Sequence, residues 1–318
     1  MAELVDAHDS KSCGVIHESS ILSPGTMQKL LVILGPTASG KSALAVKLAK
    51  KLNGEIISAD SRQVYKGLDI GTGKITKKEM SGIPHHLLDV ANPKNRFSVA
   101  EYQKLAREKI SQIFSRGHLP ILCGGTGFYI SSIVDNISLP SVAPNKKLRK
   151  TFEKESPEKL FEMLKKLDPI RASSIDSKNK VRLIRAIEIA QALGKVPTKP
   201  NTECFVFDIL QIGITVPPER LKENINQRLL ARIKSGMIGE AENLHKKGLS
   251  WKRMEELGLE YRYLAYYLQN KITKEEMIAK LQTEIWHYAK RQMTWFKRDK
   301  RIKWFNINEK DDIILMCK

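Results

Sequence analysis

The chain has 318 residues, of which 42% are hydrophobic, so it can bury a sizeable core, and bulk disorder is excluded. Lysine and arginine number 54 against 35 acidic residues, giving a formal net charge of +19. This excess favours a polyanionic partner, because cations that neutralise phosphates release condensed counterions. On charge alone, a generally basic protein without such a partner is the alternative.

The four cysteines exclude two further classes of protein. Cys13, Cys123, Cys204 and Cys317 form no CxxC pair and have no histidine ligands nearby. A zinc site or a disulfide framework is therefore not expected, and the pattern fits a reducing compartment. No apolar run approaches the roughly 18 residues that cross a bilayer, so we expect a soluble, cytoplasmic protein without a membrane partner.

Residues 1–26 show neither a core pattern nor the apolar centre of a signal peptide. We expect this segment to be a disordered tail, or a stretch of a neighbouring tRNA gene translated in error, with Met27 as the true start. The genomic DNA distinguishes the two, because only the second requires an upstream sequence that folds as a cloverleaf.

A phosphate-binding pattern follows the first apolar run, residues 30–34, which is typical of a buried parallel strand. The pattern is G-x-x-x-x-G-K-S, and leucines spaced four apart follow it as in a helix. Backbone N–H groups and a helix N-terminus then converge on an anion. We predict that Lys41 reaches the terminal phosphate and that the Ser42 hydroxyl is a ligand of Mg²⁺. The motif is Gly35, Pro36, Thr37, Ala38, Ser39, Gly40, Lys41 and Ser42.

Two further apolar runs, residues 55–59 and 119–123, end in polar or glycine-rich segments. Asp60 follows the first of them, and the sequence GGTGFY follows the second. Ligands of open α/β sheets lie beyond the carboxyl ends of the strands, so we place Asp60 beside the phosphate loop. A carboxylate there can accept a proton or hold the waters of a metal ion, and the alternative is an Asp that caps a helix or a turn.

Four blocks in order resemble the signature series of the tRNA dimethylallyltransferases: GPTASGKS, SADSRQVYKGLDIGTGK, IPHHLLD and GGTGFY. The similarity continues from about Met27 through the rest of the chain. It implies an α/β fold, a P-loop NTPase-like parallel sheet flanked by helices, over residues 27–140 and 201–318. It also implies an α-helical insertion domain over residues 141–200, which in the family clamps the anticodon stem-loop of tRNA.

The resemblance implies a reaction. A dimethylallyl group passes from dimethylallyl pyrophosphate to the exocyclic N6 amine of the adenosine 3′-adjacent to the anticodon, in tRNAs reading codons that begin with U, and pyrophosphate is released. The P-loop then holds the donor's pyrophosphate instead of ATP. Asp60 matches the general base, Thr126 matches a position near the reacting amine, and Lys41 completes the implied catalytic set. Mg²⁺ is the implied cofactor, and we expect a monomer.

The resemblance also implies tRNA contacts. Asp60, Ser61, Arg62, Gln63 and Thr126 match positions that approach the target base. In the insertion, Arg149 lies near a contact position for which Lys147 is the rival, and a second contact block has a solvated charged face as its alternative. That block is Val181, Arg182, Leu183, Ile184 and Arg185.

The C-terminal part combines helical apolar spacing with cations and aromatic residues over residues 276–298. KRQMTWFKR resembles the family's C-terminal block, whose basic residues line the RNA side. For Trp286 and Trp295 we favour packing against the protein over stacking on bases. At residues 257–262 the family more often has a GYR-like block, whereas this chain has Glu-Tyr-Arg, so contacts implied there do not carry over.

Three alternatives differ in class. A P-loop nucleotide or nucleoside kinase explains the phosphate loop but not the charge or the four blocks. A prenyltransferase acting on free AMP or ADP lacks the large basic insertion. An RNA-binding scaffold with a decayed nucleotide site would not be expected to keep Lys41, Ser42 and Asp60. His85 and His86 lie on an extended segment and point to opposite sides, which disfavours a shared metal ion.

Overall fold

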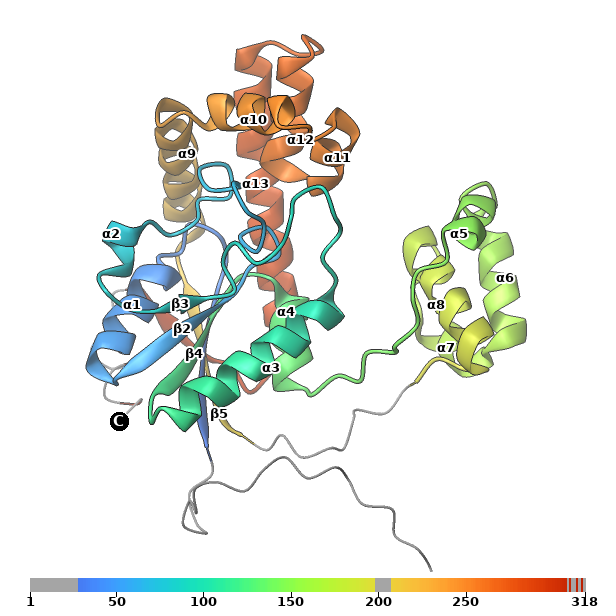
Figure 1. Ribbon diagram of the computed structural model, residues 1–318, viewed down its shortest axis with the longest axis horizontal. Coiled ribbons are helices and arrows are strands. Elements are labelled where there is room, and N and C mark those ends of the chain that lie inside the picture. The colour runs from blue at the N-terminus through green and yellow to red at the C-terminus, as the bar shows by residue number, and fades with distance from the viewer. Residues whose placement is uncertain (1–27, 198–206, 308, 310–312, 314–315, 317–318) are drawn as a thin grey trace, which may run out of the picture.

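In this computed structural model, residues 28–197, 207–307, 309, 313 and 316 are described. Six parallel strands form one sheet in the order β3-β2-β4-β1-β5-β6, with helices on both faces (Figure 1). The predicted α/β fold with a parallel sheet is therefore confirmed. The strands are β1 (Lys29–Leu34), β2 (Gly54–Ala59), β3 (His85–His86), β4 (Leu119–Gly124), β5 (Asp208–Thr215) and β6 (Lys303–Asn306).

The central strands are buried on both faces. Every residue of β1 after Lys29 is buried, and so is every residue of β2. Successive side chains of a strand point to opposite faces, so Leu31 and Ile33 join one core while Leu30 and Val32 join the other. Because no position on these strands faces water, the sequence shows unbroken apolar runs instead of an alternating pattern.

Helices cover both faces of the sheet. α1 (Lys41–Lys51) packs on one face, whereas α3 (Val99–Ser115) and α4 (Gly127–Val134) pack on the other. The short α2 (Lys77–Met80) lies in the connection between β2 and β3. α1 follows β1 and α4 follows β4, and these two strands are hydrogen-bonded neighbours. The turns at their carboxyl ends therefore lie side by side.

The helices between β5 and β6 form a lobe above the sheet edge at which the strands end (Figure 1). Their buried residues continue the core on the α3 and α4 face of the sheet. α13 has 23 residues, so at about 1.5 Å per residue it is long enough to run from this lobe back along the sheet to β6. The lobe consists of α9 (Pro218–Lys234), α10 (Met237–Lys246), α11 (Trp251–Leu257), α12 (Leu259–Leu268) and α13 (Lys274–Phe296).

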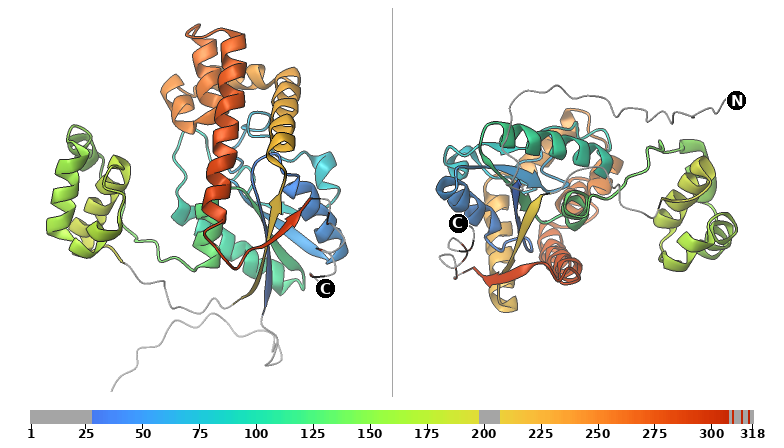
Figure 2. Two further views of the ribbon diagram at one scale, coloured as in Figure 1. Left: turned by 180° about the vertical axis from the view of Figure 1, so that it is seen from behind. Right: turned by 90° about the horizontal axis from the view of Figure 1, so that it is seen from below.

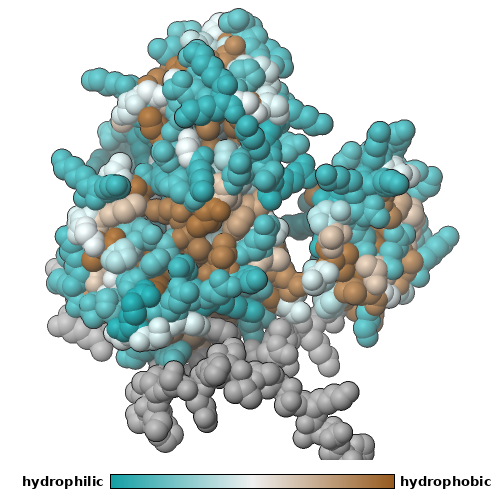
Figure 3. All heavy atoms as spheres, in the orientation of Figure 1, coloured by the Kyte–Doolittle hydropathy of each residue, from teal (hydrophilic) through white to brown (hydrophobic). Residues whose placement is uncertain are grey.

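Four helices stand apart from the sheet in a lobe of their own (Figures 1 and 2). Their core, built around Leu160, Leu164 and Ile187, shares no residue with the two cores on the sheet. Figure 3 shows that the visible face of this lobe is mostly hydrophilic, with hydrophobic residues gathered at its lower end. The helices are α5 (Lys146–Phe152), α6 (Pro157–Leu167), α7 (Pro169–Ser174) and α8 (Lys180–Leu193).

A buried carboxylate joins α5 to α8. Glu188, whose side chain is 1% exposed, accepts hydrogen bonds from Arg149 Nε at 2.7 Å and Arg185 Nη1 at 3.1 Å. It also accepts the backbone N–H of Asn145 at 3.0 Å. Burial opposes ionisation, but the hydrogen bonds from Arg149 and Asn145 outweigh it and lower the pKa of Glu188. The carboxylate is thus held charged between two arginines.

The strands predicted at residues 30–34, 55–59 and 119–123 are confirmed to within one residue at each end. The predicted tail, residues 1–26, lies outside the described residues, as does the end of the predicted insertion after residue 197. Among the helices that the structure describes, none combines the length and the apolar composition that a membrane crossing requires.

We predict that Glu188→Ala destabilises the α5–α8 lobe by about 3 kcal/mol, because it leaves two arginines without their counter-ion in a partly buried place. Hydrogen exchange of the α8 amides measures this loss locally. Glu158→Ala on the exposed face of α6 is the control and should leave α8 protection unchanged. Equal protection in the Glu188 and Glu158 variants would contradict the role given to Glu188.

Candidate functional site

The loop between β1 and α1 has the backbone conformations of an anion-binding loop. Ala38 and Gly40 have φ values of 62° and 84°, in the left-handed region. A Cβ atom at Gly35 would lie 3.0 Å from the carbonyl oxygen of Ile214, so a side chain here would be crowded against the backbone. Gly40 is also the N-cap of α1, and the loop therefore ends at the positive end of the helix dipole.

Two polar groups in this loop have fewer partners among the described residues than they could bind. Lys41 donates from Nζ to the carbonyl of Pro36 at 3.1 Å and forms no ion pair with the described residues. Burial lowers the pKa of Lys41, which marks its ammonium as poorly hydrated. The Ser39 hydroxyl is buried and has no hydrogen-bond partner among the described residues. An anion with several oxygens would satisfy both groups.

Gln292 of α13 joins the phosphate loop to the glycine-rich turn after β4. Its Oε1 accepts the Thr37 N–H at 2.8 Å, and its Nε2 donates to the Gly125 carbonyl at 2.8 Å. The residue is 6% exposed, so both ends of the amide are paired away from water. A Cβ at Gly125 would lie 2.2 Å from Gln292 Nε2, and this close contact explains the glycine.

Asp60 lies at the end of β2 in a fixed orientation. Its Oδ1 accepts the N–H groups of Arg62 at 2.8 Å and Gln63 at 3.3 Å. This is the turn-capping geometry considered as an alternative, but it uses one carboxylate oxygen and leaves Oδ2 without a donor among the described residues. The Ser61 N–H donates to Thr126 Oγ1 at 3.0 Å, so the Asp60 turn is tied to the turn after β4.

A cavity of about 250 Å³ brings these groups together. Of the predicted site residues, Thr37, Lys41 and Ser42 line it from the P-loop, and residues 60–63 line it from the end of β2. Thr126 adjoins it through its contact with Ser61. The full lining is Thr37, Lys41, Ser42, Asp60, Ser61, Arg62, Gln63, Thr72, Cys123, Gly124, Arg228, Arg232, Leu257, Gly258, Leu259, Glu260, Ile285, Tyr288 and Gln292.

Two arginines of α9 were missed by the sequence analysis. Arg228 donates to the Gly73 carbonyl at 2.9 Å and Arg232 to the Gly71 carbonyl at 2.7 Å. Arg232 also pairs with Glu260 at 3.1 Å, whereas Arg228 forms no ion pair with the described residues. Their spacing of four places both on one helix face, a signal that was present in the sequence.

Tyr288 of α13, one of the aromatic residues noted within residues 276–298, also lines the cavity, four residues before Gln292 and therefore on the same helix face. Burial raises the pKa of Tyr288, so its hydroxyl stays protonated at neutral pH. Asp60 lies close enough to add to this shift. The hydroxyl is thus a neutral hydrogen-bond donor inside the cavity.

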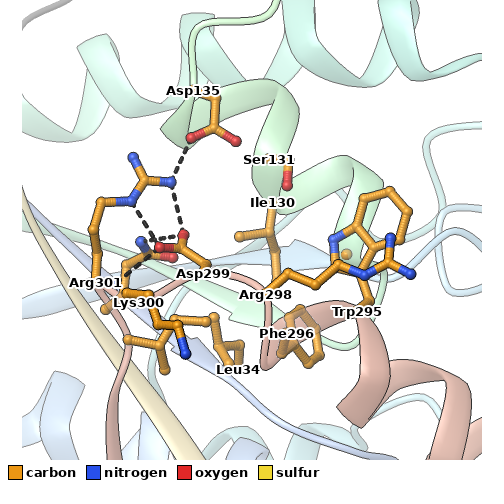
Figure 4. Close-up of a pocket in the computed structure, with 13 residues that line it drawn as sticks. Leu34, Ile130, Ser131, Asp135, Trp295, Phe296, Arg298, Asp299, Lys300 and Arg301 are labelled. Carbon is orange, nitrogen blue, oxygen red and sulfur yellow. Dashed lines mark hydrogen bonds and ion pairs between the residues drawn. The ribbon is translucent and has the colours of Figure 1, made fainter. Parts of the chain in front are cut away.

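A second cavity, of about 350 Å³, lies between α4 and the turn that follows α13 (Figure 4). Arg301 donates to Asp135 at 2.5 Å and to Asp299 at 2.7 Å, as the dashed lines show. Hydrogen bonds from Arg301 lower the pKa of Asp299 to about 2. Because Asp135 is the C-cap of α4, this network fixes the start of the chain segment that leads to the α5–α8 lobe.

Two aromatic residues of α13 contact the protein itself in different ways. The Trp295 ring fills the space where a Cβ at Gly127 would lie, at 2.2 Å, and so packs against α4. Two cations lie near the Trp286 ring, Lys222 Nζ at 5.0 Å and Lys290 Nζ at 5.6 Å from its centroid. Stacking of these rings on RNA bases stays a prediction.

The predicted contact residues of the insertion divide into three groups. Arg149 and Arg185 are held by Glu188. Leu183 and Ile184 are 0% and 6% exposed, and their side chains pack the lobe's core, so the prediction that they contact RNA is corrected for these side chains. Val181 is 79% exposed, and Arg182 is exposed beside it.

The adjacent histidines His85 and His86 contact protein groups beside strand β3. His86 Nε2 lies 2.6 Å from Glu55, and His85 Nδ1 lies 2.8 Å from the Ile83 carbonyl. Their side chains thus have separate partners, as expected for adjacent residues of a strand. Within the described ranges there is no cluster of three or more His, Cys, Asp or Glu residues that could hold a metal ion.

The IPP transferase family matches residues 63–299. A tRNA dimethylallyltransferase of Anoxybacillus flavithermus is 43% identical over 286 residues, which cover 89% of this chain and 91% of that protein. A solved tRNA isopentenylpyrophosphate transferase of Bacillus halodurans is 36% identical with a TM-score of 0.70, over 91% and 95% of the two chains. A eukaryotic dimethylallyltransferase acting on tRNA reaches a TM-score of 0.76 at 27% identity, over 88% and 74%.

These matches span most of the chain, and they agree with the four sequence blocks, three of which contribute residues to the cavity. The chain therefore belongs to the IPP transferase family, the tRNA dimethylallyltransferases.

Proposed function

We propose that this protein transfers a dimethylallyl group from dimethylallyl pyrophosphate to the N6 amine of the adenosine 3′-adjacent to the anticodon of tRNA. The observation that carries the proposal is one cavity in which an anion-binding loop faces an oriented carboxylate. The allylic C–O bond breaks and the new N6–C bond forms. The N6 proton passes to Asp60, and pyrophosphate leaves on the P-loop.

The P-loop and α9 are suited to hold the leaving pyrophosphate. Lys41 and the loop N–H groups supply donors, and Arg228 adds a guanidinium that has no ion-pair partner among the described residues. Charge accumulates on the pyrophosphate as the C–O bond breaks, so these donors stabilise the transition state more than the ground state. The buried Ser39 hydroxyl would gain the partner that it lacks.

Mg²⁺ fits this donor set. The Ser42 hydroxyl and the Asp60 carboxylate line the same cavity, and Mg²⁺ commonly takes one or two protein oxygens together with phosphate oxygens and water. We propose Ser42 as its protein ligand. When bound, the ion would neutralise charge on the pyrophosphate.

Asp60 is placed to act as the general base. The exocyclic amine of adenine is a poor nucleophile, so positioning and proton removal both assist its attack. The turn fixes Oδ1 and leaves Oδ2 free to accept the proton. Thr126, held by Ser61, and the neutral Tyr288 hydroxyl are polar groups that would position the adenine.

Residues 141–200 are proposed as the clamp on the anticodon stem-loop, with the core formed by residues 27–140 and 201–318 acting as a monomer. Exposed Val181 and Arg182 are the first contact candidates, and residues 61–63 would meet the target base. Arg149 would contact RNA only with the guanidinium surface that Glu188 leaves free. A single-stranded loop suits such recognition, because its bases can turn outward.

Labelled dimethylallyl pyrophosphate, incubated with tRNA, AMP or ATP in parallel, tests this function directly. We expect label in tRNA and none in AMP, and we expect no ATP turnover. Label in AMP alone would indicate a transferase of free nucleotides, and ATP turnover alone would indicate a kinase. Binding of tRNA without any transfer would indicate a scaffold.

Replacing Asp60 separates chemistry from binding. Asp60→Asn keeps an oxygen that can cap the turn but removes the base, so we expect kcat to fall roughly 10²- to 10⁴-fold with tRNA affinity retained. Single-turnover kinetics and filter binding measure the two quantities. Asp208→Asn, on the exposed start of β5, is the matched control. Equal losses of tRNA binding and of transfer would contradict the role of Asp60.

Replacing Gln292 tests the junction of the two turns. Gln292→Leu keeps the side-chain volume but leaves the Thr37 N–H and the Gly125 carbonyl unpaired in a buried place. We expect the KM for dimethylallyl pyrophosphate to rise about tenfold or more. The KM for tRNA should change less. Gln282→Leu, roughly 15 Å away on the same helix, is the control. An unchanged KM for dimethylallyl pyrophosphate would contradict the role of Gln292 in joining the two turns.

A further inference from the structure

One carboxylate outside the catalytic cavity gathers an unusual set of donors. Glu240 of α10 accepts the Asp69 and Ile70 N–H groups on Oε2 at 2.9 and 2.6 Å. On Oε1 it accepts the Gly71 N–H at 2.9 Å and the Tyr261 hydroxyl at 2.6 Å. Three consecutive backbone N–H groups thus point at a single side chain from another lobe. This connection lies in the segment after β2 that has no helix or strand of its own.

In the same segment Thr72 lines the cavity, and the carbonyls on either side of it hold two arginines that also line it. The Gly71 carbonyl accepts Arg232, and the Gly73 carbonyl accepts Arg228. A Cβ at Gly71 would lie 2.6 Å from the Tyr261 hydroxyl, and a Cβ at Gly73 would lie 2.6 Å from Arg228 Nη2. Both glycines therefore allow the backbone itself to touch Tyr261 on one side and the arginines on the other.

We propose that Glu240 and Tyr261 are a positioning pair for the pyrophosphate site. They fix residues 69–73 so that two backbone carbonyls orient Arg228 and Arg232 toward the phosphate loop. Neither member of the pair lines the catalytic cavity, so both act through the arginines. The inference rests on the proposed function of that cavity, and it assigns a role to two residues of the C-terminal lobe.

The chemistry of the pair explains why a carboxylate stands here. Its two oxygens offer enough acceptor sites for all four donors, whereas an amide has one oxygen and would turn an NH₂ group toward backbone N–H groups. Hydrogen bonds to a charged acceptor are also the stronger kind. Burial, with Glu240 beside it, raises the pKa of Tyr261, so the hydroxyl stays protonated and continues to donate.

Arg228 is held by fewer contacts than Arg232, so the positioning of residues 69–73 should be measurable through Arg228. Arg232 is occupied by Glu260 and the Gly71 carbonyl, but Arg228 has the Gly73 carbonyl as its hydrogen-bond partner and also lines the catalytic cavity. A shift of residues 69–73 would therefore release Arg228 first. Binding of the pyrophosphate group should suffer, and binding of RNA should not.

The test uses Glu240→Gln in the full chain, with Tyr261→Phe as a milder second variant. We expect affinity for inorganic pyrophosphate, measured calorimetrically, to fall about tenfold in Glu240→Gln and less in Tyr261→Phe. The KM for dimethylallyl pyrophosphate should rise in parallel while the tRNA affinity stays unchanged. In an Arg228→Lys background the Glu240→Gln effect should largely disappear, since the two residues act in one chain of contacts.

Glu242→Gln, two residues along α10 and half exposed, is the matched control. Wild-type affinity for pyrophosphate in Glu240→Gln would overturn the inference, as would full additivity with Arg228→Lys or an equal loss of tRNA affinity. The pyrophosphate titration needs no catalysis. Failure of the wild-type protein to label tRNA would therefore reject the proposed function while leaving the test of the positioning pair intact.

Discussion

Gln292 makes one site out of two turns that the sheet places side by side. The phosphate loop follows β1 and the glycine-rich turn follows β4, but neighbouring strands alone do not fix how two turns meet. The buried amide does so with two hydrogen bonds of 2.8 Å, one to the Thr37 N–H and one to the Gly125 carbonyl. Both of those backbone groups would be costly to leave unpaired, so the amide is specified in both position and orientation.

The charged groups around this junction have separate tasks. Asp60 is held by its own turn, and Arg232 is held by Glu260. Lys41 and Arg228 have no ion-pair partner among the described residues, and both line the cavity. A polyanion is the ligand that completes such a site, because it satisfies cations that have no counter-ion in the described part of the chain. In the proposed reaction, this ligand is the leaving pyrophosphate of the donor.

Local sequence signals predicted the parts of the structure that depend on local physics. Unbroken apolar runs located β1, β2 and β4, because a parallel strand buried on both faces has no polar positions. The phosphate loop and Asp60 were also found, since glycines at a strand end and a carboxylate after the next strand carry their chemistry in adjacent residues. The resemblance of the four sequence blocks to a known family further predicted the reaction and the helical insertion.

The features that the sequence could not predict are those that depend on long-range packing. Arg228 and Gln292 reach the cavity from helices that are distant in sequence from the P-loop, and only the tertiary structure brings them there. Leu183 and Ile184 matched a contact block, but a helix must bury one face, and these residues are on it. Glu260, at a position where the family more often has a GYR-like block, has an ion pair with Arg232 that no local pattern reveals.

The central claim is that a single cavity holds the pyrophosphate on the P-loop and the adenine amine at Asp60. A crystal structure with an unreactive thiolo-diphosphate analogue of the donor and an anticodon stem-loop tests it most directly. The account predicts the diphosphate against residues 35–42 and Arg228, and the adenine N6 about 3 Å from Asp60 Oδ2. A diphosphate bound elsewhere, or an adenine whose amine points away from Asp60, would contradict it.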